Sequence, residues 1–203
     1  MLSLTSVDKS FGGLKVIDSV SFNVAKGSRT ALIGPNGAGK TTIFNLLSGI
    51  YEVDEGSITL DNNDITNIPA RKRINIGMSR SFQNIRLMPH LNTIENVMLG
   101  QHHLANSTKE NFFPLGLIKS NKWAKQAEQA LIDAGLETYP GQVVSELPYG
   151  IQKRIEVVRA LVSNPKLLLL DEPAAGLNST ETKELQTLLE KVSSTGTTLL
   201  LVE

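Results

Sequence analysis

The sequence predicts an α/β fold with a mainly parallel sheet, and three features support this prediction. Short apolar runs alternate with segments of helical periodicity along most of the chain. A glycine-rich stretch at 34–39 joins a strand-like run to a helical one. The four leucines at 167–170 form the continuous apolar run that a strand covered on both faces requires.

The first elements lead from an N-terminal antiparallel β part into the parallel sheet. Apolar and polar residues alternate over 20–24, which is typical of a half-buried strand. Residues 29–33 form the next predicted strand and run into the glycine-rich stretch. Apolar residues then recur at helical spacing over 43–47, and Gly49 is expected to end that helix.

The middle of the chain, 84–160, is expected to be an inserted and mostly helical subdomain. Asn92 and Glu95 have the spacing of a capping box, so a helix should begin there. Further helices are predicted over 122–134 and 150–163 from their apolar spacing.

Residues 106–120 show no period and are expected to form a loop between two of these helices. Phe112, Phe113 and Leu115 in this loop either dock on a partner or cover the subdomain.

The last part of the chain reads as a βαβ unit. The strand at 167–170 is followed by a helical pattern over 185–192 and by a strand-like run over 197–202. The whole chain, 1–203, is therefore expected to be one domain, with a core made of 1–83 and 161–203.

Composition narrows the classes of protein that fit. The chain has 203 residues, 40% hydrophobic and 20% charged, which favours a globular protein over a disordered one. Twenty basic residues balance twenty acidic ones, so no overall field favours nucleic acid. Cysteine is absent, which excludes disulfides and thiolate chemistry. The N-terminus lacks a signal-peptide pattern, and no apolar run reaches the length of a membrane span.

A complete phosphate-binding motif follows the strand at 29–33. It reads Gly34, Pro35, Asn36, Gly37, Ala38, Gly39, Lys40 and Thr41, matching G-x-x-x-x-G-K-[ST]. Glycines let backbone N–H groups approach phosphate oxygens, and the following helix presents free N–H donors. Lys40 would pair with the β- and γ-phosphates, Thr41 with Mg²⁺ and Thr42 with the α-phosphate region. The motif predicts a nucleoside triphosphate site.

Two acidic residues directly follow the buried strand at 167–170. Asp171 is expected to hold Mg²⁺ through its water shell, and Glu172 to orient or deprotonate an attacking water. Together with the phosphate motif, this pair predicts hydrolysis of the bound nucleotide.

The chain resembles the ATP-binding subunits of ABC transporters over essentially its whole length. Four further segments carry the resemblance: Ser81-Phe82-Gln83 is similar to the Q-loop, 147–152 to the signature motif, 174–178 to the D-loop, and Phe11 to the adenine-stacking aromatic. The resemblance implies an ATPase that uses ATP and Mg²⁺.

Within this family, the segments 80–87, 93–97, 101–102 and 172–178 are similar to the subunit of importers for leucine, isoleucine and valine. The resemblance implies a cytoplasmic location on the inner face of the cell membrane. It also implies two transmembrane permease subunits as partners and, indirectly, an extracytoplasmic substrate-binding protein.

The resemblance assigns further site residues. Phe11 and Val16 would contact adenine, and Gln83 would reach the Mg²⁺ or the attacking water. The N–H groups at the start of the helix at 150–163 would form an anion site. Tyr149, Gly150 and Gln152 there would face the γ-phosphate held by a second ATP-binding subunit, in a head-to-tail dimer.

Two departures from the family pattern are visible. Pro148 replaces the usual serine of the signature motif and offers neither a hydroxyl nor an N–H. The sequence also reaches Glu203 without the histidine that, in the family, follows the strand after the D-loop helix. Either the chain is truncated at its C-terminus, or it binds ATP and hydrolyses it slowly.

Several basic residues are expected to lie on the solvent-exposed surface and to have no catalytic or metal-binding role. Lys153, Arg154 and Arg159 flank the apolar stripe of the helix at 150–163 and are expected to form a solvated face. Residues 71–73 read as a solvated basic turn. The three histidines, His90, His102 and His103, are not expected to bind a metal.

Three alternatives remain open. The chain could serve an importer for another small solute such as urea or an amide. It could be a soluble ABC ATPase that switches a nucleic-acid-associated machine, although it lacks a second cassette and strong basic patches. It could also be an ATP-binding regulatory protein without a transport partner.

Overall fold

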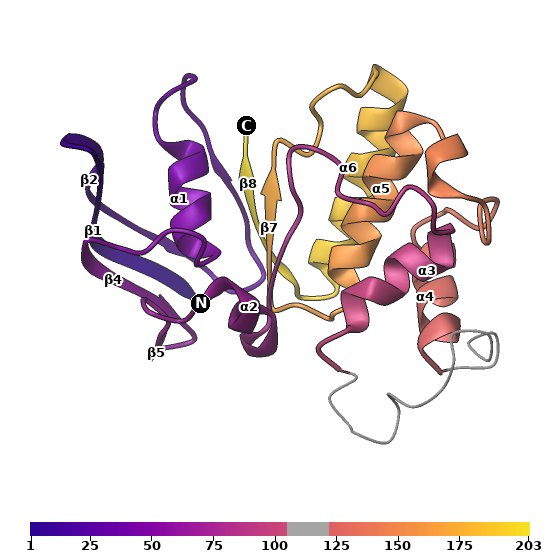
Figure 1. Ribbon diagram of the computed structural model, residues 1–203, viewed down its shortest axis with the longest axis horizontal. Helices are drawn as coiled ribbons and strands as arrows, with labels where there is room; N and C mark the ends of the chain where they lie inside the picture. Colours follow the sequence, from indigo (N-terminus) through magenta and orange to yellow (C-terminus); the bar gives the residue numbers. More distant parts are fainter. Residues whose placement is uncertain (105–121) are drawn as a thin grey trace.

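A computed structural model describes residues 1–104 and 122–203, and it contains an antiparallel and a parallel sheet with helices around them (Figure 1). The expected α/β architecture, with a mainly parallel sheet and an N-terminal antiparallel part, is confirmed. The predicted loop at 106–120 and its three apolar residues lie outside the described residues. Within the described part, no helix is both long and apolar enough to cross a bilayer.

The antiparallel sheet has the strand order β2-β1-β4-β5. Its strands are β1 (Leu2–Phe11), β2 (Leu14–Val24), β4 (Glu55–Leu60) and β5 (Asn63–Asp64). Leu4 of β1 pairs with Phe22 of β2 and with Ile58 of β4. The predicted strand at 20–24 is thus the end of a longer strand, and one face of this sheet is buried.

The parallel sheet has the strand order β3-β8-β7-β6. Its strands are β3 (Arg29–Leu32), β8 (Thr198–Val202), β7 (Leu167–Asp171) and β6 (Met78–Arg80). Every residue of β7 is buried, as the leucine run predicts. Leu167 and Leu169 face one apolar cluster and Leu168 and Leu170 the other, because side chains alternate along a strand.

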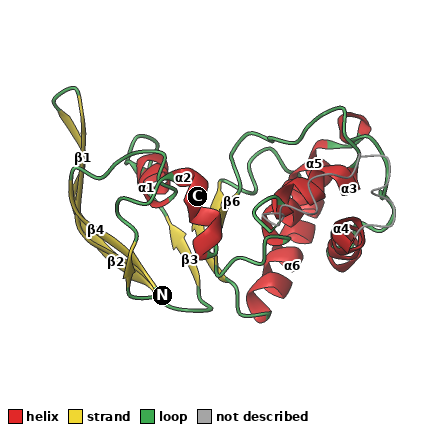
Figure 2. Cartoon of the chain, turned by 60° about the horizontal axis from the view of Figure 1, so that its bottom comes forward, coloured by secondary structure: helices red, strands yellow, loops and turns green. Residues whose placement is uncertain are grey.

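Helices cover both faces of the parallel sheet (Figures 1 and 2). The α-helices are α1 (Lys40–Leu47), α2 (Ala70–Arg73), α3 (Thr93–Met98), α4 (Lys122–Asp133), α5 (Tyr149–Leu161) and α6 (Ser179–Ser194), with short 3-10 turns η1 (Ile74–Ile76), η2 (Leu99–Gln101) and η4 (Val144–Glu146). α1 packs between the two sheets, where Phe44 is fully buried. Helices α3 to α6 pack on the opposite face of the parallel sheet.

The capping box of α3 is confirmed in atomic detail. The Asn92 side chain accepts from the Glu95 N–H at 2.9 Å, and the Glu95 carboxylate accepts from the Asn92 N–H at 2.9 Å. The short strand β6 was not predicted, because three residues are too few to show a period.

The prediction that the charged residues of α5 form a solvated face is wrong. The Lys153 side chain is fully buried, Glu156 is 1% exposed and Arg154 is 9% exposed. α5 is enclosed on both sides, and its charged groups bind protein atoms in place of water. The expected solvated turn at 71–73 is also wrong for Arg73, which is buried and donates to the carbonyls of Ile68 and Thr66.

Candidate functional site

The phosphate loop connects β3 to α1 through two glycines with left-handed backbone angles. Gly37 has φ 84° and Gly39, the N-cap of α1, has φ 83°. A Cβ on Gly39 would lie 2.7 Å from Ile17 Cδ1. Glycine is therefore required at Gly39, and the first N–H groups of α1 open toward the loop.

The ammonium group of Lys40 is turned back into its own loop. It donates to the carbonyl oxygens of Gly34 and Pro35, the second at 3.1 Å. Both partners are neutral carbonyls, whereas phosphate oxygens form stronger charge-assisted bonds with an ammonium group. The loop thus holds a cation ready for an anionic ligand.

A pocket of about 180 Å³ lies over this loop. Its lining residues are Val16, Asn36, Gly37, Ala38, Gly39, Lys40, Thr41, Thr42 and Glu172. The fold therefore brings the predicted catalytic carboxylate to the phosphate loop, although the two are far apart in the sequence.

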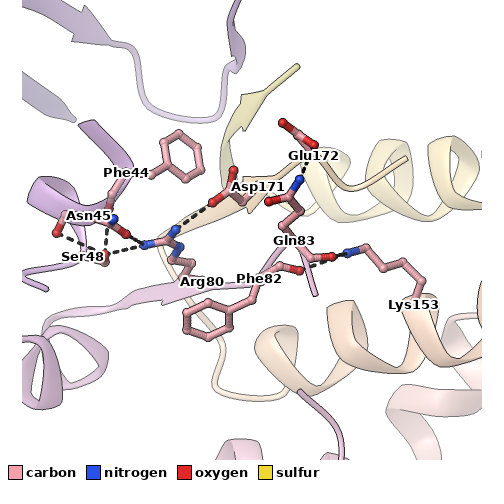
Figure 3. Close-up of polar contacts among 9 residues, drawn as sticks. All are labelled: Phe44, Asn45, Ser48, Arg80, Phe82, Gln83, Lys153, Asp171 and Glu172. Carbon is pink, nitrogen blue, oxygen red and sulfur yellow. Dashed lines mark hydrogen bonds and ion pairs between the residues drawn. The ribbon is translucent and has the colours of Figure 1, made fainter. Parts of the chain in front are cut away.

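Asp171, the last residue of β7, forms a buried ion pair. Its Oδ2 lies 2.7 Å from Nη2 of Arg80, which ends β6 (Figure 3). Nη1 of Arg80 donates to the Asn45 side chain at 2.7 Å and to the Ser48 hydroxyl at 2.8 Å, near the end of α1. The predicted metal-binding carboxylate is thus held by an arginine to which sequence reasoning assigned no role.

Glu172 lies where the chain turns out of the sheet, in an unusual backbone conformation. Its φ is 44°, which is costly for a residue with a side chain, and its N–H donates to the Val202 carbonyl at 3.1 Å. Its Oε2 accepts from Nε2 of Gln83 at 2.7 Å (Figure 3). The two predicted catalytic residues therefore meet in the structure.

The residues around the pocket fit a Mg²⁺ ion carried by a nucleotide. Among the described residues, no group of three His, Cys, Asp or Glu side chains could hold a metal by itself. Mg²⁺ in nucleotide sites needs only one or two protein oxygens, with phosphates and water filling the other positions. The hydroxyl of Thr41, which lines the pocket, is an oxygen of this kind. The carboxylate of Asp171 is a second one, located outside the pocket lining, and its Oδ2 accepts from Arg80.

Of the two predicted adenine contacts, the structure places Val16 at the phosphate loop. Val16 forms part of the pocket wall. Phe11, at the end of β1, is 41% exposed and makes an edge contact with Tyr51, with ring centroids 5.2 Å apart. Tyr51 is an aromatic neighbour that sequence reasoning missed, since nothing local links the two residues.

The signature segment lies across the parallel sheet from α1, at the start of α5 (Figure 1). A Cβ on Gly150 would lie 2.4 Å from Oε1 of Glu181 in α6, and one on Gly176 would lie 3.2 Å from Cε1 of Tyr149. Both glycines are thus explained by close packing. Nε2 of Gln152 donates to the Leu147 carbonyl at 2.8 Å, and Pro148 caps α5 without a side-chain bond. The structure groups the signature segment with the D-loop, away from the chain's own phosphate loop.

Two functional candidates were missed or misread from the sequence: Arg80 and Lys153. The sequence does contain a sign that Lys153 is buried: the apolar residue Val157 follows it by four positions and so lies on the same face of the helix. In the structure, Val157 is fully buried. An apolar residue there indicates that α5 has a second buried face.

The comparisons with known proteins agree with this geometry. The family model described as "ABC transporter" matches residues 17–175. The chain is 38% identical, over all of its length and 81% of the relative's, to the "High-affinity branched-chain amino acid transport ATP-binding protein LivG" of Salmonella typhimurium. It is 36% identical, with the same coverage, to the corresponding protein BraF of Pseudomonas aeruginosa.

Solved structures show the same fold. An ATP-binding cassette of an ABC transporter, in its ADP conformation, superposes with a TM-score of 0.89 at 31% identity, covering 100% of this chain and 80% of that one. A bacterial ABC transporter cassette solved as a dimer gives a TM-score of 0.81 at 27% identity, covering 100% of this chain and 87% of that one.

Proposed function

The chain belongs to the ABC transporter family of ATP-binding ATPases, and from this premise we propose that it energises an importer for branched-chain amino acids. The relatives named above support the cargo, since both are branched-chain amino acid transport proteins. The observation that carries the ATPase chemistry is the position of Glu172, which lines the phosphate-loop pocket and accepts from Gln83.

In this proposal, the phosphate loop binds the triphosphate of ATP. The N–H groups at the start of α1 and the ammonium group of Lys40 would replace the weaker bonds to Gly34 and Pro35. Val16, which lines the pocket, and the exposed ring of Phe11 would contact adenine.

Glu172 is proposed to accept a proton from the attacking water. Gln83 is proposed to orient both the Glu172 carboxylate and this water. The amide of Gln83 donates to one carboxylate oxygen of Glu172, which leaves the other oxygen for a water proton. The backbone strain at Glu172 supports this role, because strained residues cluster at active sites. Bound Mg²⁺ would neutralise the charge that develops on the phosphates. Thr41 and Asp171 are the residues that would hold it, with Gln83 nearby.

Tyr149, Gly150 and Gln152 are proposed to act on the ATP of a second subunit. ABC cassettes form dimers, as the dimeric relative illustrates. Because α5 begins on the far side of the parallel sheet from α1, its N–H groups cannot serve the chain's own phosphate loop (Figure 1). A head-to-tail dimer would bring them to the partner's nucleotide.

A groove of about 520 Å³ between the core, the 3-10 turn η2 and α5 is proposed to receive a permease. Ile50, Met88 and Leu99 expose large apolar side chains at this groove. Phe82 also lines it and is the neighbour of Gln83. An apolar segment of a membrane-spanning partner seated there would touch Phe82, the residue next to the one that meets Glu172. The inner face of the cell membrane is the corresponding location.

Reconstitution in vesicles tests this function. The chain should co-purify with two membrane-spanning permease subunits, and with them and a substrate-binding protein it should drive ATP-dependent uptake of leucine. Met88→Asp should weaken co-purification by placing a charge in the groove. Uptake of urea but not leucine would support the alternative cargo. Failure to associate with any membrane protein would support a soluble ATPase.

A further inference from the structure

Lys153 is a buried lysine whose charge is directed at the backbone of the segment containing Gln83. Its ammonium group donates to the carbonyl oxygens of Phe82 at 3.0 Å and of Gln83 at 2.7 Å (Figure 3). The side chain comes from the second turn of α5, 70 residues further along the chain. α5 therefore holds the backbone on both sides of the Phe82–Gln83 peptide.

Two more charged residues on the same face of α5 extend this attachment. A carboxylate oxygen of Glu156 accepts from the Arg86 N–H at 3.2 Å, and Nη1 of Arg159 donates to the Arg86 carbonyl at 2.6 Å. Glu156 also lies 3.8 Å from Lys153 and 3.7 Å from Arg159. The three side chains form a ladder of alternating charge along residues 82–86.

Burial of these charged side chains costs desolvation free energy. Desolvation lowers the pKa of Lys153, and the carboxylates of Glu156, Asp171 and Glu172 oppose that effect. Desolvation likewise raises the pKa of Glu156. A buried ammonium group is retained only where its donors find acceptors, and here two of the acceptors are carbonyls of the functional segment.

The segment that Lys153 binds includes Gln83, which contacts Glu172. Lys153 fixes the carbonyl of Gln83, and the side chain of the same residue donates to Glu172 at 2.7 Å. A change in the position of α5 is thus transmitted through one residue to the proposed general base.

We propose that Lys153 is a positioning residue for ATP hydrolysis, which fixes the backbone at Phe82 and Gln83 to α5 and so places the Gln83 amide against Glu172. This inference rests on the proposed function, because it needs Glu172 to act on the attacking water. It adds a residue outside the recognised motifs and a route from the signature helix to the chemistry. Displacing the Gln83 amide by about 1 Å is enough to reduce turnover by up to about 100-fold.

The first test measures the attachment without nucleotide. Lys153→Met preserves length and apolar bulk but removes the donors, whereas Lys153→Arg retains them. Hydrogen exchange of the amides at 83–86 should become about 10-fold faster in the Met variant and stay close to wild type in the Arg variant. Unchanged exchange in Lys153→Met would overturn the proposed attachment.

The second test asks whether Lys153 acts through Gln83. Lys153→Met should lower kcat about 10-fold or more, with KM for ATP within about 2-fold, because the phosphate loop is untouched. In a Gln83→Ala background, the same substitution should have almost no further effect. Additive losses in the double variant would overturn the inference and indicate general destabilisation.

Arg73→Met provides a matched control. Arg73 is also a buried cation that donates to two loop carbonyls, those of Ile68 and Thr66, but it has no contact with Gln83. Its removal should lower thermal stability without the change in exchange at 83–86. If the wild-type protein binds ATP but does not hydrolyse it, the proposed function is wrong. If the wild-type protein hydrolyses ATP and Lys153→Met does so equally well, only the positioning role of Lys153 is wrong.

Discussion

The phosphate loop at 34–41 and the segment at 80–83 both lie against Glu172 but are held in different ways. Lys40 bonds only to carbonyls five and six residues before it. Arg80 bonds to residues 32, 35 and 91 positions away, and the carbonyl of Gln83 to one 70 positions away. The conformation of the phosphate loop is determined locally. The segment at 80–83 is positioned by the packing of α1, β7 and α5 around it.

The proposed function assigns nucleotide binding to the first region and turnover to the second. We expect a locally held loop to keep its conformation when distant parts of the molecule move, so that nucleotide affinity stays constant. We expect a segment bonded to α5 to follow that helix, so that the rate of hydrolysis changes with it. The following predictions test this division, from the largest expected effect to the smallest.

Glu172→Gln should lower kcat for ATP hydrolysis by about 1,000-fold while ATP still binds, since the amide cannot accept the water proton. Phosphate release and nucleotide binding, measured on the same preparation, check both parts. ATP should also hold the variant as a dimer in size-exclusion chromatography. Normal turnover would remove Glu172 from its proposed role and separate the segment at 80–83 from catalysis.

Lys40→Ala should weaken ATP binding by about 100-fold, because no other cation in the loop replaces its bonds to the β- and γ-phosphates. Isothermal titration calorimetry measures the loss. The urea midpoint of the nucleotide-free protein should stay within experimental error, since Lys40 bonds only to its own loop. A large loss of stability would contradict the local character of this region.

Arg80→Met should lower the free energy of unfolding by about 2 kcal/mol, because it leaves the buried Asp171 carboxylate without its cation. Urea unfolding in the presence of EDTA, followed by Trp123 fluorescence, measures the change. Adding Asp171→Asn should recover part of the loss. An unchanged midpoint for Arg80→Met would show that tertiary contacts do not hold this segment.

Gly39→Ala should cost about 1 kcal/mol of stability, because alanine is strained at φ 83° and its methyl group would press on Ile17. The loss should be confined to the loop, with hydrogen exchange at 82–86 unchanged. Faster exchange at 82–86 would reveal a coupling between the two regions that the hydrogen bonds do not show.

Much of the site could be predicted because its parts are short and contiguous. The eight residues at 34–41 specify their own backbone through glycine and the start of α1. The apolar run of β7 marks a strand covered on both faces, and the acidic pair directly follows it. The larger groove beside Phe82 could not be predicted, since its walls come from segments distant in the sequence.

The burial of the charged residues of α5 could not be predicted from the apolar stripe of this helix. Helical periodicity identified one apolar stripe and left Lys153 opposite it, on a face that an isolated helix would expose. In the fold, the segment at 82–86 covers that face and supplies carbonyl acceptors for the ammonium group. A charged residue alone does not reveal whether its partner will be water or protein.

The sequence by itself determined the α/β class, the phosphate-binding loop, the buried strand with its acidic pair and the capping box at Asn92, because each depends on residues within a few positions of one another. Only the tertiary structure decided that Gln83 donates to Glu172, that Arg80 neutralises Asp171 and that Lys153 joins α5 to both sides of the Phe82–Gln83 peptide. These contacts join residues 70 to 91 positions apart, and their geometry follows from how sheets and helices pack against each other.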